Sequence, residues 1–292
     1  MKFDISIVIV NYNTGKYLFN CICSIFQSNP SLKLEIIIID NDSSDDSIEF
    51  LNSYKQNFTL IKNKSNLGFS KALNLGLRKS SAKYVCILNP DTLCDQNSMQ
   101  KMFDYMEKSL DVACLSPKIV NSDGSFQISC KRSLPTIKNS FFKITGIDKL
   151  FPSSSFFGSY NLLYLDENEI NQVEVISGAC MFMRYEVLKL VGYFDESFFM
   201  YGEDIDYCHR INEAGLKILY YPDSKVVHFK GVSAESRPYE VISEFHNSMI
   251  KYYDKYQLKY PFWKLSKIFI VSIIIVKKYL SYFIHFVRNR VK

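Results

Sequence analysis

Apolar runs, amphipathic segments and polar turns alternate along roughly the first 90 residues. Four short runs rich in β-branched residues predict buried strands, at residues 5–10, 35–39, 58–61 and 84–88. Helical spacing of apolar residues predicts three helices between them, at residues 16–28, 45–56 and 69–79. This alternation predicts an α/β fold with a mostly parallel, Rossmann-like sheet.

The pattern changes after this region. Between about residue 115 and residue 170 the periodicity is weak, and Ser, Asn, Phe and Lys dominate. Long irregular segments inside a domain are usually functional or mobile, so residues 126–136 and 141–157 are expected to face a partner. Regular structure is predicted to return with a strand at 174–184 and a helix at 185–191.

Polar residues lie at the carboxyl ends of three of the predicted strands: Asn11, Asp40 and Asp91. Parallel α/β sheets bind ligands at the carboxyl ends of their strands, so these three side chains are candidates for one site. Asp40 begins the run D-N-D-S-S-D, which has an alternative role as a helix cap. As a ligand, its carboxylate would accept N–H groups of a pyrimidine base.

Asp91 ends the turn Asn89-Pro90-Asp91, and a purely structural turn is the alternative interpretation. A carboxylate held in this way also suits Mg²⁺ or Mn²⁺, which proteins bind with one or two carboxylates and the phosphates of a substrate. His228 follows an apolar run and could be structural. If Asp91 binds a metal, His228 becomes a candidate second ligand.

The densest group of ionisable residues lies in F-M-Y-G-E-D-I-D-Y-C-H-R, residues 199–210. Acids in the first turn of a helix are stabilised there, which is the structural alternative. Aromatic neighbours favour instead a partly dry cleft, in which Glu203 and Asp204 could take a proton from a sugar hydroxyl. The glycine-bearing loop at 66–76 matches neither the dinucleotide-binding nor the P-loop pattern, which disfavours dehydrogenases and P-loop enzymes.

Taken in order, these segments resemble family 2 glycosyltransferases of the GT-A fold, particularly their rhamnosyltransferase-like branch, over residues 5–233. The matching motifs are V-I-V-N-Y-N (8–13), I-I-I-I-D-N-D-S-S-D (36–45), N-L-G-F-S-K-A-L-N-L-G (66–76), L-N-P-D (88–91), S-G-A-C-M (177–181), residues 199–210 and V-V-H-F-K-G-V-S (226–233). The chain departs from the family's D-x-D motif, because Asn89 occupies the position of the motif's first Asp.

The resemblance implies a role for each matching residue. Asp204 would be the catalytic base, supported by Glu203, and Asp91 with His228 would hold the divalent cation. Ser177 and Gly178 would line the donor-sugar pocket. The nucleotide-binding residues would be Asn11, Asn13, Asp40, Asn41, Gly68, Lys71 and Asn89. The chain would divide into a nucleotide-binding half at 1–115, an acceptor-binding half at 116–245 and a tail at 246–292.

The implied activity is inverting transfer of a sugar, L-rhamnose from dTDP-rhamnose, to a hydroxyl of a lipid-linked or cell-surface glycan. The alternatives are another UDP-sugar-dependent transferase of polysaccharide or O-antigen assembly, and an inactive sugar-nucleotide-binding protein. A processive synthase is disfavoured, because the Q-x-x-R-W motif is absent and the only Trp is Trp263.

The charge distribution and the cysteine content indicate where in the cell the protein is expected. Residues 251–292 contain ten Lys or Arg and one acid, Asp254, in a chain of net charge +5, which suggests an anionic surface as partner. The eight cysteines form no C-x-x-C motif, and the first residues do not resemble a signal peptide. We therefore expect a reduced, cytoplasmic protein.

The tail contains an apolar run of nine residues, 268–276, which is shorter than the roughly 20 residues of a spanning helix. At about 100° per residue the polar residues of the tail form one arc, which Val271 and Ile274 interrupt. The members of the arc are Lys264, Lys267, Lys278, Ser281, His285, Arg288 and Lys292. The alternatives are a core helix and an in-plane helix on the inner face of the cell membrane. The long aliphatic runs suit lipid better than nucleic acid.

Overall fold

A computed structural model describes residues 2–28, 31–52, 57–229, 231, 238–256 and 263–291. The strands of its main sheet are β1 (Ile5–Asn11), β2 (Leu34–Asp40), β3 (Thr59–Lys62), β4 (Tyr84–Leu88), β5 (Thr92–Cys94), β6 (Val112–Val120), β8 (Asn171–Gln172), β10 (Cys180–Arg184) and β11 (Lys217–His228). They run in the order β3-β2-β1-β4-β10-β6-β11-β5, with β8 beside β11. A second, two-stranded sheet pairs β7 (Lys131–Arg132) with β9 (Val175–Ile176).

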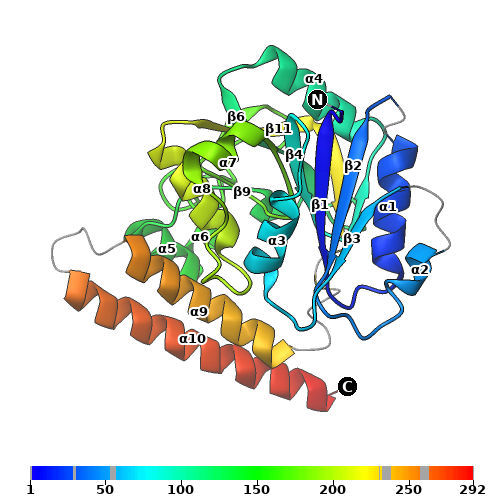
Figure 1. Cartoon of the computed structure of the whole chain (residues 1–292). Helices are drawn as coiled ribbons and strands as arrows, with labels where there is room; N and C mark the ends of the chain where they lie inside the picture. Colours follow the sequence, from blue (N-terminus) through cyan, green and yellow to red (C-terminus); the bar gives the residue numbers. More distant parts are fainter. Residues whose placement is uncertain are drawn as a thin grey trace.

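The half of the sheet made by β3, β2, β1 and β4 is parallel throughout. Every residue of β1 is buried, as its continuous apolar run predicts for a strand covered on both faces. In the register of β1 and β2, Asn11 lies beside Asp40. The ends of these strands therefore meet at one edge of the sheet, the lower edge in Figure 1.

The helices are α1 (Lys16–Ser28), α2 (Glu49–Asn52), α3 (Phe69–Leu77), α4 (Ser98–Lys108), α5 (Ile137–Thr145), α6 (Ile147–Leu150), α7 (Tyr185–Val191), α8 (Glu203–Glu213), α9 (Pro238–Tyr256) and α10 (Trp263–Val291). α1 begins and ends where its apolar spacing predicts, and it buries Leu18, Cys21, Ile22 and Ile25. The helix predicted at 45–56 is shorter in the structure: α2 begins at Glu49, and residues 53–56 lie outside the described residues.

The weak pattern after residue 115 concealed a strand. β6 spans Val112–Val120 and is buried along almost its whole length, although it contains Pro117. Proline cannot donate a hydrogen bond to a neighbouring strand. The register between β6 and β11 shifts immediately after the pair of Pro117 and Tyr221, so the irregularity in β11 falls where the ladder would lose a donor.

The single strand predicted at 174–184 was wrong. β9 pairs with β7 in the small sheet, whereas β10 lies antiparallel between β4 and β6 in the main sheet. The residues between them, Ser177, Gly178 and Ala179, form the turn that carries the chain from one sheet to the other. This break places Ser177 and Gly178 at the edge of the main sheet, next to α8.

The C-terminal helices lie side by side below α5, α6 and α8 (Figure 1). The predicted boundary between residues 245 and 246 falls inside α9. α9 is joined to α8 by the fully buried carboxylate of Asp206, whose Oδ1 accepts hydrogen bonds from Tyr256 Oη at 2.8 Å and Lys255 Nζ at 2.6 Å. The first tail helix is therefore part of the folded body.

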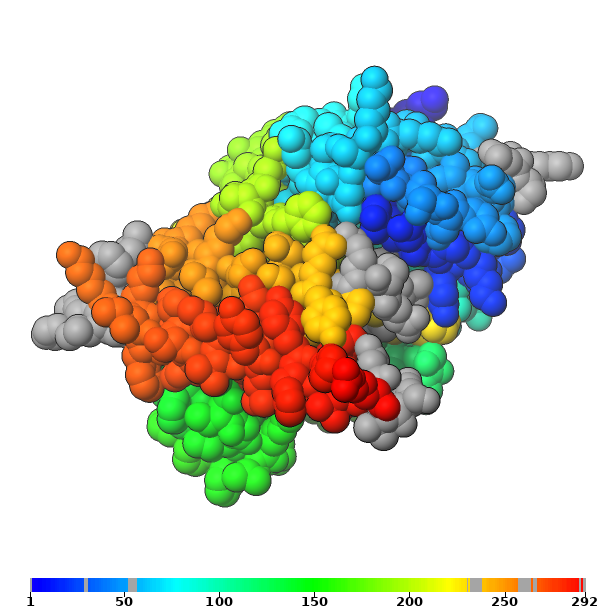
Figure 2. Space-filling model, turned by 90° about the horizontal axis from the view of Figure 1, so that it is seen from below, coloured from blue at the N-terminus to red at the C-terminus, as the bar shows by residue number. Residues whose placement is uncertain are grey.

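Part of the polar arc predicted for α10 faces the protein, whereas Lys264 and Arg288 of the same arc are exposed. Lys278 Nζ donates to Ser243 Oγ of α9 at 2.7 Å, and Lys267 Nζ lies 2.8 Å from Asp254 Oδ1. The opposite side of α10 carries large apolar side chains that are mostly exposed, including Phe269, Val276 and Phe283. In Figure 2, α10 forms a ridge across this face of the molecule, beside the segment of α5 and α6. Lys292, also assigned to the arc, lies outside the described residues.

The nine-residue run underestimated the apolar length of the tail, because the helix continues through Lys277 and Lys278. Within the described part of the chain, α10 is the one helix long and apolar enough to cross a membrane, over the 22 residues Lys267–Arg288 with a mean hydropathy of 1.6. Length and composition alone do not place it in a bilayer, and its polar side is packed on α9.

Gly68 permits a close backbone approach that another residue would prevent. Its φ is +82°, and an added Cβ would lie 2.6 Å from the ring of Phe199 and 2.8 Å from the carbonyl oxygen of that residue. We expect Gly68→Ala to lower the free energy of unfolding by about 2–4 kcal/mol, from overpacking and the left-handed backbone. Gly124→Ala is the control for the second cause, because Gly124 has φ +84° and nothing within 4 Å of an added Cβ. Urea unfolding measures both, and equal losses would contradict the steric argument.

Candidate active site

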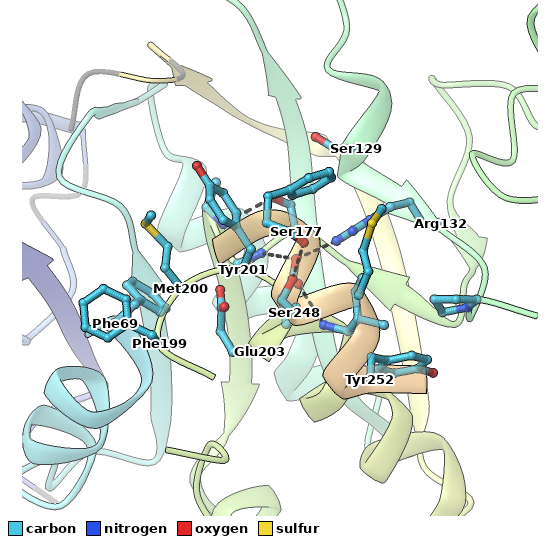
Figure 3. A pocket seen from close by; sticks show the side chains of 18 of the residues that line it. Phe69, Ser129, Arg132, Ser177, Phe199, Met200, Tyr201, Glu203, Ser248 and Tyr252 are labelled. Atoms are coloured by element: carbon cyan, nitrogen blue, oxygen red, sulfur yellow. Dashed lines mark hydrogen bonds and ion pairs between the residues drawn. The ribbon is translucent and has the colours of Figure 1, made fainter. Parts of the chain in front are cut away.

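A cavity of about 560 Å³ opens beside the carboxyl ends of the parallel strands. Most of the residues predicted for the site line it: Asn41, Gly68, Asn89, Asp91, Ser177, Gly178, Glu203, Asp204 and His228. They come from both predicted halves of the chain. Figure 3 shows Ser177, Glu203 and Arg132 around the same hollow, with Ser248 and Tyr252 of α9 closing one side.

Asp91 and His228 form a pair at the base of the cavity. His228 Nε2 lies 3.3 Å from Asp91 Oδ1, and both side chains are about nine-tenths buried. β5 and β11 are antiparallel neighbours that pair Thr92 with His228, which explains why residues so far apart in sequence meet. His228 Nδ1 lies 3.0 Å from Gln127 Oε1. Because an amide oxygen can only accept, Nδ1 donates its proton to Gln127, and Nε2 is the ring nitrogen that faces Asp91.

This donor set fits a divalent cation that also binds a diphosphate. His228 Nε2, which also lies 3.4 Å from Asn89 Nδ2, and a buried carboxylate oxygen of Asp91 lie 3.3 Å apart, and Gln127 orients the imidazole as metal-binding histidines require. Among the described residues, no group of three or more His, Cys, Asp or Glu side chains could hold a metal. The protein would therefore supply two ligands, and substrate phosphates and water the others.

Asp204 lies at the amino end of α8 and lines the same cavity. Its Oδ2 is 2.6 Å from Arg132 Nη2 and accepts the Gly178 N–H at 3.3 Å, while its Oδ1 accepts the Ile205 N–H at 2.8 Å. Tyr201 and Gly202 both have positive φ, and this sharp turn sets the direction in which α8 begins. A carboxylate has about four lone-pair positions, so Asp204 can still accept a substrate hydroxyl.

Glu203 is in a different environment from its neighbour. Burial, followed by the charge of Asp204, raises the pKa of the Glu203 carboxyl from 4.5 to about 8. Its Oε2 is buried without a hydrogen-bond partner in the described structure. Burial therefore favours the neutral, protonated form of Glu203.

This difference gives a pH-dependent prediction. The unfolded chain releases the Glu203 proton above about pH 4.5, whereas the folded chain keeps it up to about pH 8. The folded state binds more protons in this range, so this residue lowers the free energy of unfolding as the pH rises. We expect Glu203→Gln to gain on the order of 2–3 kcal/mol relative to wild type between pH 5 and pH 8. Thermal unfolding across this range measures the change, with exposed Glu213→Gln as control; a constant difference would contradict it.

The residues predicted to bind the nucleotide include some that line the cavity and some that lie behind it. Asn41 and Gly68 line the cavity, and Asn41 Oδ1 accepts hydrogen bonds from the Leu67 N–H and from Asn63 Nδ2, each at 3.0 Å. Asn11 is fully buried behind the cavity wall, where its Nδ2 donates to Asp40 Oδ1 at 3.0 Å. Such a bond positions Asp40.

Asn13 and Lys71 lie away from the cavity wall. Asn13 has φ +51°, and its Oδ1 accepts the Ser44 N–H at 2.8 Å, which ties the loop after β1 to the loop after β2. Lys71 is exposed on α3, outside the lining of the cavity. Their contacts with a nucleotide remain predictions.

Sequence reasoning missed two residues of the site, Arg132 and Gln127. Both lie in the segment 126–136, which we expected to face a partner, but neither belongs to a recognisable motif. Arg132 is almost fully buried against Asp204, and Gln127 holds His228 at both its Nδ1 and its carbonyl oxygen. Their roles come from pairing across the fold, for which local sequence gives no signal.

The parallel half-sheet, the cavity at its carboxyl edge and the carboxylates on both sides of it define the class of GT-A glycosyltransferases. Residues 6–190 match the family model for Glycosyl transferase family 2. The chain belongs to that family, and it is an enzyme that transfers sugars; inversion at the anomeric carbon is typical of the family.

Two relatives and one solved structure extend this finding. The chain is 26% identical over 253 residues to the N-acetylglucosaminyl-diphospho-decaprenol L-rhamnosyltransferase of Mycobacterium tuberculosis, covering 83% of this chain and 81% of the relative. It is also 26% identical to the low-salt glycan biosynthesis hexosyltransferase Agl10 of Haloferax volcanii, covering 85% and 75%. The crystal structure of GalNAc-T7 with UDP, GalNAc and Mn²⁺ superposes with a TM-score of 0.58 at 17% identity, covering 77% of this chain and 44% of that chain. The last likeness concerns the fold.

Proposed function

We propose that this enzyme transfers L-rhamnose from dTDP-rhamnose to a hydroxyl group of a lipid-linked glycan. The observation that carries the proposal is the shared cavity of the Asp91–His228 pair and Asp204, which can hold a nucleotide diphosphate and an acceptor hydroxyl at once. The rhamnosyltransferase named above supports the choice of sugar and of a lipid diphosphate acceptor.

The donor binds with its base toward Asp40 and Asn41 and its diphosphate toward Asp91 and His228. Asp91 and His228 would hold Mg²⁺ or Mn²⁺, and the bound cation would supply positive charge to offset the charge on the departing diphosphate. Ser177 and Gly178 place the sugar between this pair and α8. Holding both substrates in line contributes on the order of 7–11 kcal/mol in ideal cases.

Asp204 acts on the acceptor. Its carboxylate takes the proton of the acceptor hydroxyl while that oxygen attacks the anomeric carbon from the face opposite the diphosphate. The new C–O bond forms as the bond to the diphosphate oxygen breaks, and the configuration inverts. Arg132 keeps Asp204 in position through its bond at 2.6 Å, and the protonated Glu203 beside it adds no second negative charge.

A donor panel tests the proposal. Purified protein is incubated with dTDP-rhamnose or with UDP-sugars, and with N-acetylglucosaminyl diphosphates on lipid chains, and release of nucleoside diphosphate is measured. We expect dTDP release that depends on the acceptor, and a product with inverted configuration by NMR. Transfer only from a UDP-sugar would replace the donor, and donor binding without transfer from any donor would favour the inactive sugar-nucleotide-binding alternative.

We also propose that the enzyme is cytoplasmic and lies on the inner face of the cell membrane, with α10 in the plane of the surface. The exposed apolar side chains of α10 and basic residues such as Arg288 and Arg290 support this. We expect co-sedimentation with anionic vesicles and at least a tenfold loss of it in the triple variant Phe269→Asp, Val276→Asp, Phe283→Asp. Leu190→Asp, on exposed α7, is the control. Resistance to alkaline carbonate extraction would contradict a peripheral helix and favour a span.

A further inference from the structure

The catalytic cavity continues beyond its carboxylates. From Asp204 it extends beneath the C-terminal helices, where apolar side chains from three helices line it: Ile137 and Ile144 of α5, Met249 and Tyr253 of α9, and Ile270 and Ile274 of α10. A nucleotide-sugar is polar along its whole length. This apolar extension of the cavity therefore suits the acceptor better than the nucleotide-sugar donor.

The extension approaches the exposed apolar face of α10. A second hollow of about 380 Å³ lies between α5 and α10, and it is lined mainly by apolar residues such as Phe269, Val276 and Leu280. Ile144 lines both hollows, and Ile274 lines the inner one while being 3% exposed. Apolar surface thus runs from the catalytic cavity through the seam between α5 and α10 to the outside, beside the ridge seen in Figure 2.

Cations surround this seam. Lys143 lines the catalytic cavity, and half-buried Lys277 places its Nζ 3.5 Å from the carbonyl oxygen of Ile144. Burial, and then the charges of Lys143 and Lys149, lower the pKa of Lys277, while Asp148 opposes them in part. Three ammonium groups near one another with one carboxylate leave net positive charge, which attracts a phosphate group.

We propose that the extension binds the lipid chain of a lipid diphosphate acceptor, with the chain in the seam between α5 and α10 and the diphosphate near Lys143 and Lys277. The acceptor sugar then points to Asp204. Burial of the chain against Ile144, Ile270 and Ile274 supplies affinity in proportion to the apolar area removed from water. The identity of the sugar transferred in this inference rests on the proposed function.

Chain-length dependence tests the site. Acceptors with one head group, N-acetylglucosaminyl diphosphate, and methyl, C10 or C15 isoprenoid tails are compared in detergent, so that binding of the protein to vesicles does not contribute. We expect KM to fall at least tenfold from methyl to C15. Ile274→Trp and Ile144→Trp fill the extension, and each should raise KM for the C15 acceptor at least tenfold relative to KM for the methyl acceptor.

Ile275→Trp is the matched control. Ile275 is the next residue on α10, is 42% exposed, and lines neither hollow, so this variant should keep the chain-length dependence of wild type. Wild-type KM values that do not depend on chain length would overturn the proposal, as would full retention of that dependence in both filled variants.

A binding measurement separates this proposal from the proposed function. Equilibrium binding of a fluorescent C15 isoprenoid diphosphate needs no donor and no transfer. Binding that both filled variants weaken at least tenfold, and that inorganic pyrophosphate competes with only weakly, supports the lipid site even if the sugar or donor is a different one. Absence of binding with normal donor turnover overturns the lipid site and leaves the proposed transfer intact.

Discussion

Asp204→Asn is expected to slow sugar transfer by about 10²–10⁴-fold, the usual contribution of a general base. The amide keeps the shape of the carboxylate and can still accept through its oxygen, but it cannot take the hydroxyl proton. Donor affinity, measured by calorimetry with the nucleotide-sugar and Mn²⁺, should change little, because Asp204 is bound to Arg132 and the Asp91–His228 pair is a separate group. The loss should therefore appear in kcat.

Glu213→Gln provides the comparison, since Glu213 ends the same helix with its side chain 52% exposed. That variant should transfer sugar at the wild-type rate. A normal rate in Asp204→Asn, with donor still bound, would remove Asp204 from the role of base. Glu203 would then be the next candidate, active above pH 8 where it ionises.

Asp91→Asn should lower kcat/KM by about 10²–10³-fold, because loss of a charged ligand leaves diphosphate charge uncompensated in the transition state. The Mn²⁺ concentration that gives half-maximal activity should rise at the same time. Wild-type activity should disappear in EDTA and return when Mg²⁺ or Mn²⁺ is added in excess.

Asp95→Asn serves as the control, because Asp95 is a surface acid paired with Lys225 at 3.1 Å, with about half of each side chain exposed. Its metal dependence should match wild type. Full activity of wild type in EDTA would show that the cation is dispensable, and the Asp91–His228 pair would then act on the diphosphate through His228 alone.

Local sequence predicted the amino-terminal half well, because a strand buried on both faces is a continuous apolar run there. β1, β2 and β4 lie within a residue or so of their predicted limits. β6 was harder, since Pro117 and Lys118 interrupt its apolar run and the compensating shift lies in β11, about 100 residues away. A strand whose irregularity is compensated in a distant partner strand cannot be recognised from its own residues alone.

The candidate site divides in the same way. Asp91, Glu203 and Asp204 are prominent because acids after strands and at helix starts are visible in sequence, and the cavity contains all three. Arg132 has a role only because β7 and β9 bring it to α8. For α10, helical periodicity gave the polar arc, but periodicity does not say which side meets a neighbour, and that side was the polar one.

The buried carboxylate of Asp206 has a consequence for the geometry of the whole assembly. Through Lys255 and Tyr256 it fixes α9 to α8, and α10 is packed along α9. These contacts hold the exposed apolar side of α10 and the amino end of α8 together. With α10 on a lipid surface, as proposed above, they would set the height of Asp204 above that surface. We expect such a height to favour lipid-linked acceptors whose reactive hydroxyl lies at that distance from the surface, and longer glycans on the same lipid to react more slowly.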